Sequence, residues 1–155
     1  MARAQNSIYL VLLADDSEDD GFLLEMAFGQ LDRLRLLPRM SGGAQTIAYL
    51  KGEGKYWDRR HYPLPDLLLL DLKMPEVDGF QVLEWLQCNP LPNLAVAVLS
   101  GTNAPGEIKQ ALTMGAHFFQ TKELGNSQQI LALKALEQQV IRNKEAAGRL
   151  AYGRA

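Results

Sequence analysis

The sequence has little of several things, and each shortage excludes a class of protein. Cys88 is the only cysteine among 155 residues, so no intramolecular disulfide can form and a reducing cytoplasm fits best. The formal net charge is −2, which lacks the basic excess of a nucleic-acid-binding domain. The apolar runs are far too short to span a bilayer, so we expect no membrane association.

An apolar run near the N-terminus, "IYLVLLA" at residues 8–14, resembles the hydrophobic region of a signal peptide. It continues directly into the acidic "DDSEDD" with no small-residue cleavage site, so we reject that interpretation and expect a cytoplasmic protein. The length predicts one domain. We place it at residues 7–147, followed by a short C-terminal tail at 148–155 and no output domain.

Short apolar runs alternate with longer amphipathic stretches along the chain. The runs at 8–14, 66–72 and 94–101 are continuous, which is typical of strands buried on both faces. Strands that alternate with helices indicate an α/β protein with a parallel sheet covered on both sides. We expect strands at 8–14, 35–40, 66–72, 94–101 and 117–122, and helices at 17–31, 43–52, 80–88, 104–116 and 127–147.

Several local signals refine these elements. Ser17 and Asp20 fit a capping-box pattern, so we assign the acidic residues from Ser17 onward to the start of a helix. Gly148 is expected to end the last helix, which Asn126 or Ser127 can cap. The first helix has apolar residues at helical spacing: Phe22, Leu23, Met26, Ala27 and Leu31.

Two further features concern side chains of the helices and loops. Cys88 lies in a helical stretch and is expected to be a buried small hydrophobe. Residues 53–65 form a polar and aromatic segment that is long for a connection within one domain. Its Tyr56 and Trp57 either fold back on the core or form a patch for a partner, and the pattern does not choose between these.

Polar side chains follow four of the expected strands. In an open α/β sheet, ligands bind outside the carboxyl ends of the strands. The first strand ends at Asp15 and Asp16, and later strands end at Asp71, Ser100 and Lys122. Three carboxylates, a hydroxyl and an ammonium are therefore expected at one edge of the sheet.

Three carboxylates in one crevice repel each other and need a counter-charge. Mg²⁺ bound by oxygen ligands supplies it where a phosphoryl group is handled. Asp71 would then be placed to attack phosphorus and form an aspartyl phosphate. The metal, Lys122 and the Ser100 hydroxyl could each hold one phosphoryl oxygen.

Four motifs now point to a family. "LLADDS", "LLLLDLKMPEVDGF", "AVAVLSG" and "FFQTK", in that order, resemble the receiver domain of two-component response regulators over about residues 8–147. The resemblance implies a flavodoxin-like (βα)5 fold, a single domain with a doubly wound five-stranded parallel sheet in strand order 2-1-3-4-5.

The resemblance also implies roles for individual residues. Asp71 would be the phosphoacceptor, and Mg²⁺, or Mn²⁺ as a substitute, would be the cofactor. The metal ligands would be Asp15, Asp16, Asp71 and the backbone carbonyl of Lys73. The residues that bind phosphate or switch with it would be Ser100, Gly101, Lys122 and Phe119.

Three departures from the family pattern stand out. Glu123 follows Lys122 where the family usually has a proline with a cis bond, and a cis bond before a non-proline residue would cost roughly 2.5–4 kcal/mol. Phe119 replaces the commoner tyrosine. Lys73 lies two residues after Asp71, where it would be close to the phosphoryl group.

The resemblance narrows the partners as well. "SEDD" and the inserted "GKYWDRRHYPLP" are similar to stand-alone regulators that partner bacteriophytochrome kinases. The donor would be a sensor histidine kinase or a histidine phosphotransfer protein, and a homodimer could form through the fourth helix, fifth strand and fifth helix. We expect no enzyme activity beyond self-phosphorylation from small donors and autodephosphorylation.

Two function classes are carried forward. The first is a switch controlled by phosphorylation of Asp71. The alternative is a phosphorylation-independent interaction module on a receiver scaffold, because a fold alone does not fix a function. A flavodoxin-like cofactor binder is disfavoured, since acids at the end of the first strand would repel a phosphate.

Overall fold

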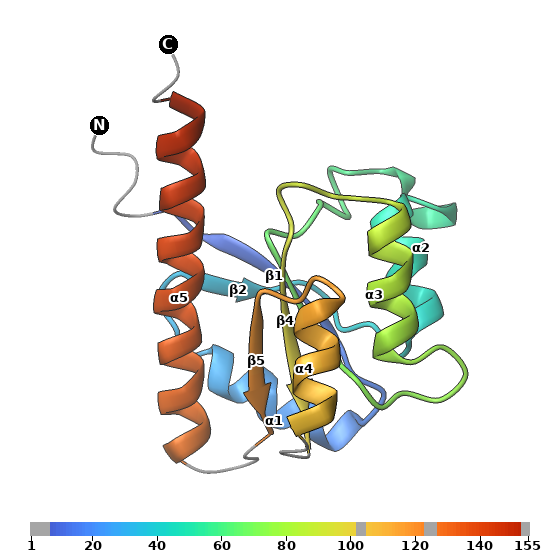
Figure 1. Ribbon diagram of the computed structural model, residues 1–155, viewed down its shortest axis with the longest axis horizontal. Coiled ribbons are helices and arrows are strands. Elements are labelled where there is room, and N and C mark those ends of the chain that lie inside the picture. Colours follow the sequence, from blue (N-terminus) through green and yellow to red (C-terminus); the bar gives the residue numbers. More distant parts are fainter. Residues whose placement is uncertain (1–6, 102–104, 123–126, 153–155) are drawn as a thin grey trace.

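The computed structural model describes residues 7–101, 105–122 and 127–152 and contains one parallel sheet (Figure 1). Its order is β2-β1-β3-β4-β5, and every neighbouring pair is parallel. The predicted flavodoxin-like topology is therefore confirmed. The strands are β1 (Tyr9–Ala14), β2 (Leu34–Leu36), β3 (Leu67–Asp71), β4 (Ala95–Ser100) and β5 (Phe118–Thr121).

Five α-helices cover the two faces of the sheet, with a 3-10 turn between the second helix and β3. They are α1 (Glu18–Phe28), α2 (Gly43–Lys51), η1 (Gly54–Trp57), α3 (Gly79–Cys88), α4 (Pro105–Thr113) and α5 (Ser127–Tyr152). Neither these helices nor η1 combine the length and apolarity needed to cross a bilayer.

The core consists of two hydrophobic layers separated by the sheet. Leu68 and Leu70 face α2, α3 and α4, whereas Leu67 and Leu69 face α1 and α5. All four are fully buried. Alternate side chains of a strand enter different layers, and both layers are apolar. The central strands therefore appear in the sequence as continuous apolar runs.

The inserted segment at 53–65 folds back on α2. The Arg59 guanidinium donates hydrogen bonds to the carbonyls of Tyr49, Leu50 and Tyr62, and so closes the C-terminal end of α2. Tyr56 is buried against the ring of Tyr49, at 5.0 Å between centroids. Of the two aromatic residues of this segment, Tyr56 therefore folds back on the core, whereas Trp57 is 74% exposed.

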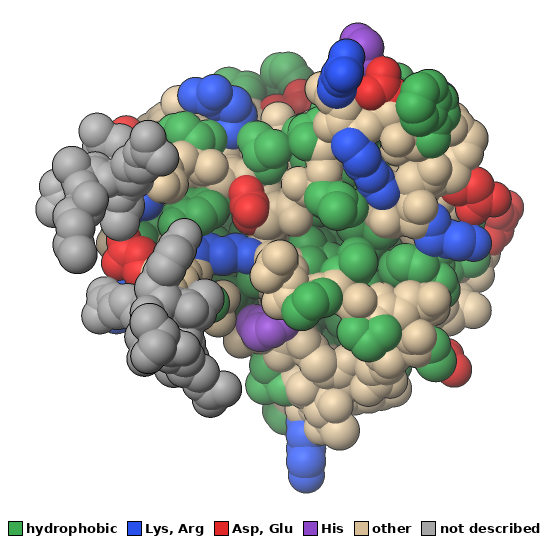
Figure 2. Space-filling model, turned by 90° about the horizontal axis from the view of Figure 1, so that it is seen from above, with side chains coloured by type: hydrophobic (Ala, Val, Ile, Leu, Met, Phe, Trp, Pro, Cys, Tyr) green, Lys and Arg blue, Asp and Glu red, His purple; other side chains and the backbone are tan. Residues whose placement is uncertain are grey.

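The surface at the amino ends of the strands has an apolar centre. Figure 2, seen from that end, shows hydrophobic side chains gathered there between scattered charged ones. Here the inserted segment meets the connection between α3 and β4. A shallow hollow between them is lined by Leu50, Leu64, Pro65, Leu91, Pro92 and Leu94.

Only part of the stripe expected to bury α1 faces the core. Phe22 and Met26 are 61% and 60% exposed, whereas Leu24, Ala27 and Phe28 are buried. Apolar residues occupy most of the circumference of this 11-residue helix, so their spacing fits more than one buried face. The packing of α1 against β2 and α5 selects the face.

Two other local expectations are wrong. Cys88 is exposed, because it is the last residue of α3 and lies beyond the part that packs on the sheet. Gly148 does not end the last helix, since α5 continues to Tyr152. A glycine inside a helix costs about 1 kcal/mol relative to alanine and does not by itself stop one. The 26 residues of α5 span roughly 39 Å, and the helix projects beyond the sheet (Figure 1).

Candidate functional site

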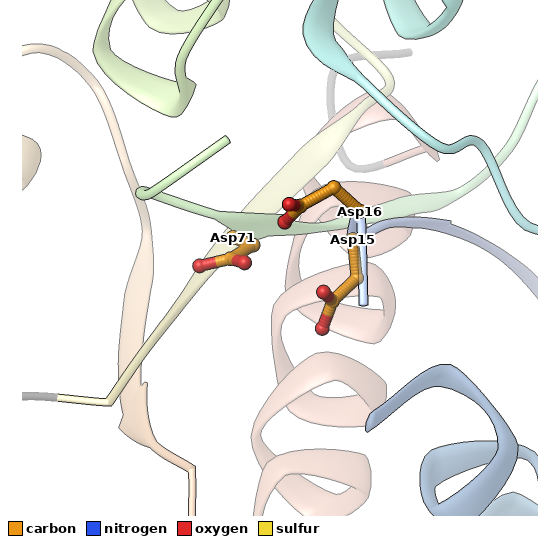
Figure 3. Close-up of side chains that lie close together, drawn as sticks. All are labelled: Asp15, Asp16 and Asp71. Atoms are coloured by element: carbon orange, nitrogen blue, oxygen red, sulfur yellow. The ribbon is translucent and has the colours of Figure 1, made fainter. Parts of the chain in front are cut away.

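The carboxyl ends of the strands bring the expected acidic residues together. Asp15 directly follows β1, and Asp71 is the last residue of β3. Because Ala14 pairs with Leu70 in the sheet, the two aspartates lie side by side one step further along. Asp16 completes the group, and carboxylate oxygens of the three residues lie within 4.8 Å of one another (Figure 3).

Lys122 supplies the counter-charge of this group. Its ammonium lies 2.8 Å from Asp15 Oδ2, 3.0 Å from Asp20 Oδ2 and 3.1 Å from Asp71 Oδ2, and its side chain is 9% exposed. The backbone N–H of Lys122 donates to the carbonyl of Ser100, which ties the lysine to the end of β4. The register of β4 and β5 therefore places the ammonium over the aspartates.

Burial and charge pull the pKa values of the site in opposite directions. Burial raises the pKa of Asp71 to about 6, although the Lys122 ammonium and the N–H of Lys73 work to lower it. Burial would lower the pKa of Lys122, but the carboxylates of Asp15, Asp71 and Asp20 outweigh it and hold that pKa above its ordinary value. The lysine is therefore charged throughout the neutral range, and the pKa of Asp71 lies close to that range.

The oxygens of the site fit a hard divalent cation. Asp15 is completely buried, and its Oδ2 has no aligned hydrogen-bond donor among the described residues, although Lys122 Nζ is 2.8 Å away. A buried carboxylate oxygen without such a donor is costly. Three carboxylates also exceed what one ammonium can neutralise. Oxygen-rich, anionic sites of this kind are those that Mg²⁺ and Mn²⁺ prefer.

Asp20 also belongs to the site. The sequence pattern had predicted for it only a role at the start of the first helix. Half of the expected capping box is present, because Ser17 Oγ accepts a hydrogen bond from the N–H of Asp20 at 3.2 Å. The other half is not, because the N–H of Ser17 donates to Asp15 Oδ1 at 3.0 Å. The Asp20 carboxylate is thereby left to bind Lys122. Helical side chains point toward the N-terminus of their helix, which was the available signal that Asp20 faces the strand end.

Comparisons with known proteins identify the family of this chain. The family model for the response regulator receiver domain matches residues 11–134. The chain belongs to this family. Response regulator Rcp1 of Synechocystis sp. is 28% identical to this receiver over 125 residues, which are 79% of the chain and 82% of Rcp1.

Solved structures of related regulators superpose on the receiver along most of its length. A phosphorylated form of the cyanobacterial phytochrome response regulator RcpA is 28% identical, with a TM-score of 0.75 over 85% of this chain and 93% of that one. RPA3017, from red light signalling in R. palustris, is 29% identical, with a TM-score of 0.72 over 83% and 91%. The Mn²⁺-bound form of Rcp1 is 25% identical, with a TM-score of 0.71 over 83% and 91%.

The remaining predicted residues of the receiver lie at the end of β4, on β5 and in the loop after β3. Ser100 is buried at the end of β4 and is followed by the exposed Gly101. Lys73 is exposed in the loop after β3, and its N–H donates to Asp71 Oδ1 at 3.1 Å. Phe119 is half-buried against the layer that contains α4. The peptide bond between Lys122 and Glu123 lies outside the described residues.

A glycine allows α3 to begin directly beside Asp71. A Cβ atom on Gly79 would lie 2.5 Å from the carbonyl oxygen of Asp71 and 2.7 Å from the Cα of Leu72. The preceding residue, Asp78, forms a capping box with Gln81 and so fixes the first turn of α3. The "DG" pair of the receiver motif thus has a packing role next to the site.

Proposed function

We propose that the protein is a stand-alone response regulator that accepts a phosphoryl group on Asp71 from a histidine kinase or a histidine phosphotransfer protein. The proposal rests above all on one observation, the Lys122 ammonium lying 3.1 Å from Asp71 Oδ2 within a buried carboxylate group. The phosphorylated RcpA and the Mn²⁺-bound Rcp1 support it by likeness. In this proposal residues 7–147 are the receiver domain, the metal is Mg²⁺, and the protein is cytoplasmic.

The phosphotransfer itself would be an in-line displacement. Asp71 Oδ2 would attack phosphorus, an O–P bond would form, and the N–P bond to the donor histidine would break with its electron pair on nitrogen. Asp15, Asp16, Asp71 and the carbonyl of Lys73 would hold the metal, which supplies positive charge to the phosphoryl oxygens. Lys122 would orient the same group from the other side.

The output would be a change in the packing around the phosphoryl group. We propose that the Ser100 hydroxyl and the backbone of Gly101 bind its oxygens, and that Phe119 then repacks against α4. A local charge change would thus bias a two-state element. Because Phe119 is half-buried at the edge of its layer, it has room to move that the fully buried Leu68 and Leu70 lack.

Incubation of the purified protein with acetyl phosphate and Mg²⁺ tests the function. We expect intact-mass spectrometry to show one phosphoryl adduct, and EDTA to prevent it because the attacking carboxylate and the incoming phosphoryl group then repel each other. If wild-type protein forms no adduct, the switch is contradicted and the phosphorylation-independent interaction module becomes the better reading.

The donor protein must cover the edge of the sheet where Asp71 lies, and α1 offers it a surface. Phe22 and Met26 are strongly exposed on α1, and Leu131 is 66% exposed near the start of α5, which packs beside α1. Exposed apolar groups gathered beside a reactive site are typical of an interaction surface. We propose that a histidine donor docks on this surface, which we name the α1 patch: Phe22, Met26 and Leu131.

Phe22→Ala should slow transfer from a phosphorylated histidine donor roughly tenfold, the loss expected for an aromatic anchor at an interface. The acetyl phosphate rate should not change, because a small donor needs no docking surface. Trp57→Ala removes another strongly exposed ring, 74% against 61% for Phe22, from the other side of the sheet and serves as the control. Equal effects of the two substitutions on histidine transfer would contradict docking on the α1 patch.

We also propose a homodimer through the face formed by α4, β5 and α5. Leu112 of α4 is 45% exposed, and α5 projects beyond the sheet. Multi-angle light scattering should show a dimer when a phosphoryl mimic such as beryllium fluoride is bound. A monomer both with and without the mimic would contradict this partner.

A further inference from the structure

Lys122 has three carboxylate neighbours, and only two of them belong to the acidic group that fits a cation. An ammonium has three donors and no acceptor. Lys122 donates hydrogen bonds to Asp20 Oδ2 and Asp71 Oδ2, and Asp15 Oδ2 lies 2.8 Å from its Nζ without an aligned N–H. A phosphoryl oxygen that approaches this ammonium therefore competes with three carboxylates.

The three neighbours differ in what phosphorylation does to them. The oxygen of Asp71 that becomes bonded to phosphorus loses its charge and its hold on the lysine. Asp15 belongs to the three carboxylates that, among the described residues, are close enough to share one cation. Asp20 is outside that group, so it keeps its full charge and remains the competitor for Lys122.

The position of Asp20 makes this competition effective. Its backbone is held in the first turn of α1 by the hydrogen bond from its N–H to Ser17 Oγ. Its side chain is 22% exposed and that of Lys122 is 9% exposed, so water screens the pair only in part. No other cation is within ion-pair distance of Asp20 among the described residues.

We propose that Asp20 is a positioning residue that holds Lys122 in the unphosphorylated protein and competes with the incoming phosphoryl group for its ammonium. The inference rests on the proposed phosphorylation of Asp71. It adds that Asp20 slows this phosphorylation, an effect that we call the Asp20 brake. Removal of the Asp20 charge should free one donor of Lys122 for the phosphodonor and so speed the formation of the adduct.

Initial rates of adduct formation from acetyl phosphate at saturating Mg²⁺ test this brake. Asp20→Asn should react roughly fivefold faster than wild type at low acetyl phosphate, the size of one partly exposed ion pair. The gain should appear as a lower half-saturating donor concentration, because the freed ammonium binds the donor before reaction. Asp20→Glu, which keeps the charge, should restore a rate near that of wild type.

Asp19→Asn is the matched control. Asp19 is the preceding residue in the same turn of α1, is exposed, and forms no ion pair with any residue that the structure describes. This substitution makes the same change in net charge and in the charge near the helix N-terminus. A rate equal to that of Asp20→Asn, or an Asp20→Asn rate at or below wild type, would overturn the proposal.

The same substitution made in a Lys122→Ala variant distinguishes an effect of Asp20 on Lys122 from a general structural effect. In Lys122→Ala, the Asp20→Asn substitution should no longer change the rate, because its partner is gone. A remaining acceleration there would overturn the proposal. The outcomes also separate the two levels of inference: no adduct on wild type defeats the proposed function, whereas an adduct with no difference between Asp20→Asn and Asp19→Asn defeats the brake alone.

Discussion

Asp71→Asn is expected to abolish the phosphoryl adduct and, in the metal-free protein, to stabilise the fold. The first effect follows because an amide is not a nucleophile toward phosphorus. The second follows from the burial of Asp71, which raises its pKa from 3.8 to about 6. Its ionised form is therefore less favourable in the folded protein than in the unfolded chain.

The sign of the pH dependence follows from this shift. The folded protein holds the Asp71 proton more tightly than the unfolded chain does, so the contribution to stability is complete below about pH 4 and is lost as pH rises through about 6. The difference between 3.8 and about 6 corresponds to about 3 kcal/mol. Because asparagine keeps only one of the two oxygens that accept from Lys122 and from the N–H of Lys73, the net gain at pH 7 should be smaller, about 1–2 kcal/mol.

Urea unfolding in EDTA at pH 5 and pH 7 measures the effect. Asp71→Asn should be more stable than wild type at pH 7, and the difference should shrink at pH 5. Asp19→Asn, an exposed aspartate on α1, should follow wild type at both values. A variant that is less stable than wild type at pH 7 would show that the lysine contact outweighs the cost of burying Asp71.

Gly79→Ala should destabilise the protein by about 3 kcal/mol, the upper range for an overpacked interior. The added Cβ would lie 2.5 Å from the carbonyl oxygen of Asp71 and 2.7 Å from the Cα of Leu72. Both are backbone atoms at the end of the central strand β3, so no side chain can rotate away. Either α3 or the end of β3 must shift, and the second also displaces Asp71, the proposed phosphoacceptor.

Gly106→Ala is the control for the glycine substitution. Gly106 lies in the first turn of α4, and an added Cβ would meet nothing within 4 Å. Alanine should be neutral there or stabilise by up to about 1 kcal/mol. The comparison is made by urea unfolding, and a similar small change in both variants would contradict the tight packing of Gly79 against β3.

Much of the site could be predicted because it depends on local pattern and on a rule of parallel sheets. The apolar runs that become β1, β3 and β4 are continuous, and Asp15, Asp71 and Ser100 stand where those runs end. Since parallel strands share a carboxyl edge, the residues had to gather there once the strands were right. The order of the strands and the roles of the residues came from the resemblance of the motifs.

The sequence by itself therefore determined which segments form the buried strands, and it determined that the acidic residues gather at the carboxyl edge of the sheet. Only the tertiary structure decided which face of α1 is buried, how far α5 extends, that Cys88 is exposed and which partner Asp20 has. The physical reason is distance along the chain. Asp20 and Lys122 are 102 residues apart in the sequence. They meet only because the sheet order β1-β3-β4-β5 brings the start of α1, which follows β1, to the same edge as the end of β5. A local pattern shows that a charge starts a helix, but packing decides which opposite charge it meets.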